Sequence, residues 1–325
     1  MIGTSRKLLG FWVFAILLAG VLLFFAFRGV NWREMLETAQ KARFEYLCLG
    51  FLIGNTAFFF RALRWRILLN AEKRVNFLVV FWSTMLGYLC NNFLPARAGE
   101  VIRSAALGRR CNISKSFVLA TALTERLLDV VALVMITLIV FMFLGNLSEW
   151  LITAVKIMGI IGLVGIIGIF LAPRFENLLK NALARLPLPH ALNTRLIGMM
   201  TQFLIGMRSF QNLSRAMSFI LLTIVIWLVD AFGSIITARA LSLVLTLPQS
   251  LLLLAALGLS SAIPSTPGSV GIYQFVAVTV LTPFGFSRSQ ALAYIIVSQL
   301  LYYSLVTIWG LLGLWRLNAM RLDTS

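Results

Sequence analysis

The residues most able to do chemistry are charged side chains that stand in otherwise apolar or helix-breaking stretches. If these stretches cross a membrane, each ionisable group near the bilayer centre costs at least ~2.5–3.5 kcal/mol unless it is paired or hydrated. Such groups therefore predict a polar site, an ion-pair network, or both. They are Arg97, Glu100 and Arg103 in NNFLPARAGEVIRSAALGRR, Glu125, Arg126 and Asp129 in ATALTERLLDVVAL, and Asp230 in IVIWLVDAFGS.

Arg97 and Arg103 are candidate phosphate ligands, because a guanidinium group presents a fork of donors that matches phosphate oxygens. Glu100 lies three residues before Arg103 and is expected to orient it. Both arginines also fit ordinary anchoring on the cytoplasmic side of a membrane. The sequence leaves that alternative open.

Glu125 and Asp129 are four residues apart and share one helix face, and Arg126 is three residues from Asp129 and can pair with it. With Asp230, these residues are candidates to line a hydrated cavity as substrate or proton sites. The alternative is a buried ion-pair network that only locks helices together. The two interpretations are compatible.

A second broken stretch, SSAIPSTPGSVGIY, occupies residues 260–273. Its prolines end one half-helix, and Gly268 and Gly271 allow a tight turn into the next. The N-terminus of a half-helix offers free N–H groups and a positive dipole end, which suit a phosphate or carboxylate. Ser265, Thr266 and Ser269 are candidates to add hydroxyl donors to this site. Ordinary helix capping is the alternative role for these side chains.

Enzymatic motifs are missing from the sequence. The single histidine, His190, lies in a predicted loop, and there is no H-E-x-x-H, G-x-S-x-G, P-loop or G-x-G-x-x-G motif. The three cysteines have no metal-site or disulfide spacing. We therefore expect no enzyme activity, no catalytic residue, no cofactor and no metal.

Composition identifies a membrane protein. Hydrophobic residues make up 60% of the 325 positions, charged residues 12%, and several apolar runs are long enough for the roughly 20 helical residues that span a bilayer. Spanning segments that run continuously apolar predict an all-α polytopic fold rather than a barrel. The net charge of +17 sits in loops beside the spans, so we expect anionic lipid headgroups and no nucleic acid as partners.

We predict one membrane domain, 1–325. It contains about six full transmembrane helices, an interfacial helix over 28–45 and a cytoplasmic loop over about 172–215. Arg61, Arg64 and Arg66 are assigned to a cytoplasmic loop after the second span. Both termini are predicted to be cytoplasmic, in an inner or plasma membrane. The predicted full spans are 8–27, 46–60, 116–144, 151–171, 216–238 and 290–315.

Two re-entrant hairpins, about 77–107 and 249–284, are predicted to enter from opposite faces. If 77–94 crossed the membrane instead, five basic residues from Arg97 to Lys115 would lie outside, against the positive-inside rule. Matching hairpins in the two halves suggest an inverted repeat with a site near the midplane. Helices broken only for packing are the alternative.

Three blocks carry a family resemblance: N-x-x-P-x-R-x-G-E-x-x-R at 92–103, T-x-x-x-E-R-x-x-D at 121–129 and P-S-T-P-G-x-x-G at 264–271. Over about 8–315 the chain resembles the lysylphosphatidylglycerol synthase transmembrane-region family, which are flippase-like membrane proteins. In bifunctional members, this region is associated with moving aminoacylated phosphatidylglycerol between leaflets. A soluble aminoacyltransferase domain is not expected, because ten residues follow Trp315.

The resemblance implies a lipid translocase for an anionic phospholipid or a polyprenyl-phosphate-linked lipid. The alternative is an accessory subunit of an envelope-biosynthesis enzyme, such as a glycosyltransferase, and an intramembrane transferase ranks last. The sequence predicts no oligomeric state.

Overall fold

The computed structural model describes residues 16–94, 98–143, 171–184, 212–261 and 266–319, with single residues and short runs between 160 and 204. In this part of the chain every regular element is helical, which confirms the all-α prediction. The helices are Ile16–Phe27, α2 (Trp32–Gln40), α3 (Phe44–Leu69), α4 (Phe77–Phe93), α5 (Gly99–Cys111), α6 (Lys115–Phe143), α8 (Glu176–Ala184), α10 (Leu213–Ala240), α11 (Leu247–Ser260), α12 (Ile272–Leu281) and α13 (Arg288–Ala319), with 3-10 turns η2 (Ala172–Phe175), η4 (Pro267–Ser269) and η5 (Thr282–Phe284).

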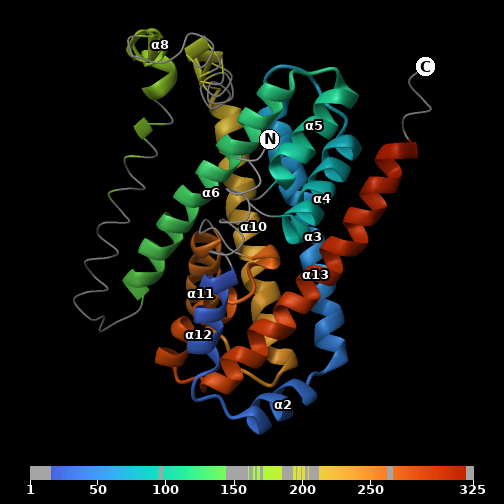
Figure 1. The fold of residues 1–325 in the computed structure, drawn as a ribbon, viewed down its shortest axis with the longest axis vertical. Helices are drawn as coiled ribbons and strands as arrows, with labels where there is room; N and C mark the ends of the chain where they lie inside the picture. The colour runs from blue at the N-terminus through green and yellow to red at the C-terminus, as the bar shows by residue number, and fades with distance from the viewer. Residues whose placement is uncertain are drawn as a thin grey trace.

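The three helices α3, α10 and α13 form the long frame of the bundle (Figure 1). Each is long and apolar enough to cross a membrane. Ile16–Phe27 and α2 are long and apolar enough to cross a membrane only if the two helices are counted as one span across the 88° bend between them. The predicted number of full spans stays a prediction, and most of the predicted span 151–171 lies outside the described residues.

The predicted interfacial segment contains α2, whose N-cap Asn31 accepts hydrogen bonds from the backbone of Arg33 and Glu34. Figure 1 shows α2 across one end of the bundle and α8, from the predicted cytoplasmic loop, at the other end. A helix that turns sharply out of the bundle direction and lies across its end has the geometry of a helix on a membrane surface.

Two short helix pairs enter the bundle from its opposite ends (Figure 1). The first pair, α4 with α5, starts from the end that holds α8, and the second, α11 with α12, starts from the end that holds α2. The turn of the first pair meets the second where α4 contacts η4. This arrangement is the one expected of the two hairpins, whereas an inverted repeat stays a prediction.

Close backbone approach holds the first hairpin together. A Cβ placed on Gly99 would lie 2.0 Å from the carbonyl oxygen of Gly87, so only glycine fits there. Asn91, near the end of α4, accepts a hydrogen bond from the Gly99 backbone N–H through Oδ1 at 2.9 Å. The side chain of α4 thereby satisfies a backbone donor that the first turn of α5 leaves unpaired.

Buried apolar residues form one cluster around each hairpin. Trp65, Leu107 and Phe117 belong to the cluster that packs α3, α5 and α6 together. Leu253 and Leu281 belong to the cluster that packs the second hairpin against α10 and α13. A third cluster, with Met85 and Leu89, packs α4 of the first hairpin against α3 and α13, so both hairpins pack against α13.

The predicted second span is too short. α3 does not end near residue 60 but continues to Leu69, so Arg61, Arg64 and Arg66 lie inside the helix and not in a loop. The apolar run does stop at Arg61, but Arg61 and Arg64 pair with carboxylates on neighbouring helices, and this pairing lets the helix continue through them.

Candidate functional site

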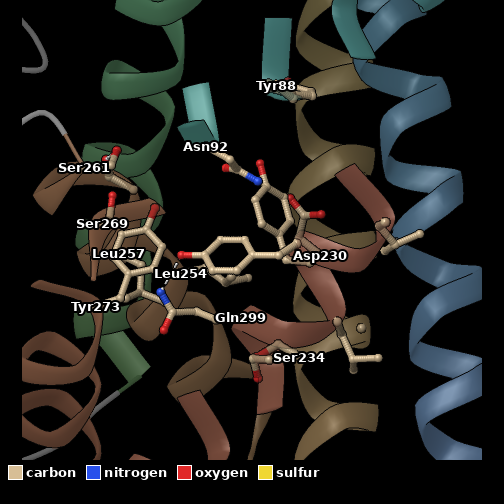
Figure 2. Close-up of a pocket in the computed structure, with 18 of the residues that line it drawn as sticks. Tyr88, Asn92, Asp230, Ser234, Leu254, Leu257, Ser261, Ser269, Tyr273 and Gln299 are labelled. Atoms are coloured by element: carbon tan, nitrogen blue, oxygen red, sulfur yellow. Dashed lines mark hydrogen bonds between the residues drawn. The ribbon is translucent and has the colours of Figure 1, made fainter. Parts of the chain in front are cut away.

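A cavity of about 630 Å³ lies where the turns of the two hairpins meet (Figure 2). Its wall combines side chains from α3, α4, α5, α6, α10, α11, α12 and α13 with the η4 turn. Cavities of roughly 300–1,000 Å³ accommodate small-molecule ligands. Its size and its position between the hairpins make it the leading candidate site.

A closed ring of alternating charge lies at one side of this cavity, and we call its six members the charge ring. Each charge has two partners of opposite sign, so the ring is neutral as a whole. The nitrogen–oxygen distances are 3.1 and 2.7 Å from Arg64 to Glu125 and Asp129, 2.5 and 3.0 Å from Arg103 to Glu100 and Glu125, and 3.0 and 3.5 Å from Arg126 to Glu100 and Asp129.

The inner part of the ring is sealed from solvent. Arg64, Arg103 and Glu125 are each 1% exposed. The guanidinium of Arg64 also donates to Thr223 on α10 at 3.1 Å, and the guanidinium of Arg103 stacks over the Trp65 ring at 4.3 Å. The ring therefore connects α3, α5, α6 and α10 in a region where unpaired charge would be strongly unfavourable.

A separate ion pair, Arg61 with Asp230, faces the cavity one helix turn before Arg64. Both guanidinium terminal nitrogens of Arg61 donate to the Asp230 carboxylate. The side chains of Arg61 and Asp230 are 20% and 16% exposed, against 2% for Arg64. Together with Glu100 and Arg126 of the charge ring, this pair forms what we call the charged end of the cavity.

The other end of the cavity is uncharged, and we call Ser261, Ser269, Tyr273, Gln299 and Tyr303 its neutral end. Figure 2 shows Ser261, Ser269, Tyr273 and Gln299 on the opposite side of the cavity from Asp230 and Tyr88. Gln299 donates to the Tyr303 hydroxyl at 3.0 Å and to a carbonyl oxygen of the η4 turn at 3.3 Å.

A buried glutamine supports the neutral end from behind. Gln274, on α12, donates to Gln299 Oε1 at 2.5 Å and accepts from the Gly271 backbone N–H at 2.7 Å. The Tyr303 hydroxyl donates to the Gly268 carbonyl oxygen. This chain of bonds fixes the second hairpin to α13 without using any charge.

The structure brings most of the predicted site residues together, but not all of them onto the cavity wall. Arg97 and Ser265 lie outside the described residues. Arg103, Glu125 and Asp129 belong to the charge ring and are not wall residues, and Gly271 packs against Ala19. The predicted residues that line the wall are Glu100, Arg126, Asp230, Thr266 and Gly268.

The predicted phosphate role of Arg103 is not supported by this geometry, because Arg103 is 1% exposed and pairs with two carboxylates. Two backbone N–H groups of the second turn are also engaged within the protein. The N–H groups of Ser269 and Gly271 are already bonded, to Thr266 and Gln274. On the described wall, the arginines that face the cavity are Arg61 and Arg126, whose side chains are 20% and 28% exposed.

Four contributors were missed from the sequence: Arg61, Arg64, Gln299 and Tyr303. The two arginines did carry a signal, since they are one helix turn apart and directly follow the apolar run FLIGNTAFFF. The polar residues of α13 gave none, because an isolated Gln or Tyr in an apolar helix is common. Among the described residues, no group of three or more His, Cys, Asp or Glu side chains is placed to hold a metal ion.

Comparison with known proteins places this geometry in a family context. The sequence profile described as Lysylphosphatidylglycerol synthase TM region matches residues 12–310. A UPF0104 membrane protein of Pyrococcus horikoshii is 22% identical over 311 residues, covering 89% of this chain and 92% of that protein. A UPF0104 membrane protein of Methanocaldococcus jannaschii is 25% identical over 222 residues, covering 68% and 90%. No solved structure gives a significant match.

Proposed function

The chain belongs to the lysylphosphatidylglycerol synthase transmembrane-region family of membrane proteins, and we propose that it is a lipid translocase. The substrate is an anionic phospholipid or a polyprenyl-phosphate-linked lipid, which moves between the leaflets of an inner or plasma membrane. The N- and C-termini lie in the cytoplasm. No covalent chemistry is part of this proposal.

The observation that carries the proposal is the charged end of the cavity. Arg61 and Arg126 are both on the wall, and both are paired with carboxylates that a phosphate group can replace. A phosphate headgroup is poorly soluble in hydrocarbon, so its passage requires donors that substitute for water. Two arginines at one end of a cavity provide such donors.

Pairing keeps these arginines neutralised when no lipid is bound. Asp230 forms an ion pair with Arg61, and Glu100 forms one with Arg126. An entering phosphate exchanges with a carboxylate, and the pair re-forms when the headgroup leaves. Exchange of this kind keeps lipid binding reversible, because the empty site is already satisfied and no bare charge is left behind.

The apolar part of the wall suits the lipid tails or the adjoining glycerol backbone. Leu254, Leu257 and Leu301 line the cavity beside the polar groups. The tails then stay in the bilayer while the headgroup occupies the cavity between hairpins that start from opposite ends of the bundle. This placement of a site between opposed broken helices is the one used by transporters that expose a site alternately to each side.

Leaflet exchange in vesicles tests the proposal. Purified full chain is reconstituted with fluorescent phosphatidylglycerol, and dithionite reports the fraction of label in the outer leaflet. We expect faster exchange than in protein-free vesicles, and a loss of at least tenfold in the double variant Arg61→Gln with Asp230→Asn, which removes both charges and keeps a polar side chain at each position. The control is Arg33→Gln with Glu37→Gln, an exposed ion pair on α2.

Two results would contradict the proposal. The first is exchange that equals protein-free vesicles for phosphatidylglycerol, aminoacylated phosphatidylglycerol and a polyprenyl-phosphate lipid alike. That result would favour an accessory subunit of an envelope-biosynthesis enzyme. The second is undiminished exchange in the cavity variant, which would place the pathway elsewhere in the protein.

A further inference from the structure

The charges on the described part of the cavity wall cancel before any lipid is bound. Two arginines, Arg61 and Arg126, stand against two carboxylates, Asp230 and Glu100. The charge ring behind them, with three arginines and three carboxylates, is neutral as well. A lipid phosphate that enters the cavity therefore adds a negative charge where uncompensated charge is strongly unfavourable. Its entry is favoured when a cation enters with it.

The two carboxylates on the wall differ in the number of arginines that hold them. In the described part of the chain, Asp230 pairs with Arg61 alone, through both carboxylate oxygens. Glu100 pairs with Arg103 as well as with Arg126. A phosphate that binds Arg126 leaves Glu100 with Arg103, whereas a phosphate that binds Arg61 leaves Asp230 without its partner. Asp230 is thus the carboxylate that phosphate binding leaves uncompensated.

The surroundings of Asp230 offer it no replacement for Arg61 among the described residues. The other wall arginine, Arg126, is already held by Glu100 and Asp129, at 3.0 and 3.5 Å. Tyrosine is uncharged at neutral pH, so it cannot compensate a carboxylate charge. Apart from Glu100 on α5 and Arg126 on α6, the ionisable side chains that share the wall with this pair are tyrosines, and α11 adds none: Tyr88 on α4, Tyr273 on α12, and Tyr294, Tyr302 and Tyr303 on α13.

We propose that Asp230 binds a proton from solvent when a lipid phosphate takes its place on Arg61, so that one lipid anion crosses the membrane together with one proton. The Asp230 side chain lines the cavity (Figure 2) and is 16% exposed, so solvent can reach it. In an apolar cavity, a carboxylate without a partner is neutralised by a proton more readily than it stays charged. This inference rests on the proposed function, since it names the coupling ion of the same site.

The exchange conserves charge at every step. A phosphate oxygen replaces the carboxylate at the Arg61 guanidinium, and a proton passes from water to a carboxylate oxygen of Asp230. Arg61 with Asp230 is neutral before this step, and Arg61 with phosphate beside protonated Asp230 is neutral after it. When the headgroup leaves, the proton returns to water and the ion pair re-forms. The movement of lipid with proton is therefore electroneutral, and a pH difference drives it whereas a voltage does not.

Isothermal titration calorimetry of the purified full chain in detergent measures the coupling without transport. The probe is dihexanoyl phosphatidylglycerol, whose phosphodiester keeps a single negative charge near neutral pH. Titration in two buffers of different ionisation enthalpy gives the number of protons taken up for each lipid bound. We expect close to one proton at about pH 6, and a Kd that rises with pH by at most about tenfold per unit, because the complex holds one proton more than its free components.

Two variants assign the proton to Asp230. Asp230→Asn resembles the protonated side chain, so it should still bind the lipid but take up no proton, with a Kd that no longer changes with pH. Glu37→Gln, which neutralises a carboxylate of the exposed pair on α2, is the control and should keep the uptake of wild type. If Asp230→Asn does not fold, the wild type decides, since binding without uptake refutes the coupling by itself.

Lipid binding without proton uptake, at a Kd independent of pH, would overturn the inference, and so would uptake that persists in Asp230→Asn. Exchange in phosphatidylcholine vesicles separates this failure from failure of the proposed function. With an imposed pH difference, labelled phosphatidylglycerol should move from the leaflet that faces acid to the other, faster than in protein-free vesicles. A potassium diffusion potential should not move it.

The combinations of these results are distinct. Proton uptake on binding without any leaflet exchange supports the coupling at Asp230 and contradicts transport. Leaflet exchange that follows voltage, with no proton uptake on binding, supports transport and contradicts the coupling.

Discussion

The turns of the two hairpins meet at one cavity but are anchored by different chemistry. The first hairpin is fixed through Glu100 and Arg103, which form ion pairs with Glu125 and Arg126 on α6, and Arg103 also stacks on Trp65 of α3. The second is fixed through Gln274 and the Gly268 carbonyl, which bond uncharged groups on α13. One wall of the cavity is thus held by ion pairs and the other by neutral hydrogen bonds.

This difference teaches how the protein keeps a polar cavity in an apolar bundle. In the charge ring each group has two partners. The loss of one group therefore leaves two buried groups, both of the opposite sign to the lost one, with a single partner each. In the hydrogen bonds that link Gln274, Gln299 and Tyr303, the loss of one bond leaves only uncharged groups without a partner. We therefore expect the ring to be the more sensitive of the two, and the predictions below test that order.

The largest effect is expected for Glu125→Leu. Glu125 is 1% exposed and pairs with Arg64 and Arg103, so its removal leaves two buried guanidinium groups each with one partner fewer. Breaking a buried ion pair on one side costs about 3–5 kcal/mol. We expect a loss of this size in the free energy of unfolding, measured by SDS titration with circular dichroism.

The matched control for this variant is Glu37→Leu, which removes a carboxylate from the exposed pair on α2. That change should stay within about 0.5 kcal/mol of wild type. If Glu125→Leu were equally mild, the charge ring would not be the structural anchor that its geometry indicates.

An intermediate effect is expected when alanine replaces a glycine at a hairpin turn. In Gly99→Ala the new Cβ meets the Gly87 carbonyl oxygen at 2.0 Å and Asn91 Oδ1 at 2.5 Å, so α4 and α5 must separate. Overpacking of this kind costs about 1–3 kcal/mol. We expect a loss of that size in the same SDS titration.

Gly20→Ala provides the control for the glycine substitution, because a Cβ there has nothing within 4 Å. In a helix interior alanine is favoured over glycine, by about 1 kcal/mol at most. We therefore expect Gly20→Ala to be neutral or stabilising. A Gly99→Ala variant that behaved like this control would argue against close packing in the first hairpin.

The sequence was sufficient to predict the helical class, the two broken stretches and the local ion pairs. Arg126 with Asp129 and Glu100 with Arg103 are each three residues apart, and helix geometry alone brings such residues together. Proline and glycine mark the turns for a similarly local reason. These predictions require no knowledge of how the helices pack.

The closure of the ring and the pairing of Asp230 were not predictable, because they depend on how α3 is rotated against α6 and α10. The positive-inside rule assigned Arg61 and Arg64 to a loop, since it counts charge and does not consider the partner on another helix. Gln299 and Tyr303 of the neutral end were missed for the same reason. Gln274 and Gln299 are 25 residues apart and meet only through tertiary packing.

The smallest effect is expected for Gln274→Leu, a change that tests the neutral anchor alone. Leucine is close to glutamine in size, so the variant mainly removes two hydrogen bonds, to the Gly271 N–H and to Gln299. Net values of about 0.5–1.5 kcal/mol for each bond predict about 1–3 kcal/mol in all, and we expect the lower end, about 1 kcal/mol, because Gln299 lines the cavity and water there replaces a lost bond. SDS titration again measures it.

Gln249→Leu is the matched control. Gln249 accepts the same kind of capping hydrogen bond, from the Thr246 N–H at the start of α11, over 3.0 Å and at an exposed position. Water replaces that bond, so the control should lose only a few tenths of a kcal/mol. A greater loss in Gln274→Leu than in Glu125→Leu would reverse the order proposed for the two anchors. The second hairpin would then be the more rigid wall, and movement during transport would be expected in the first.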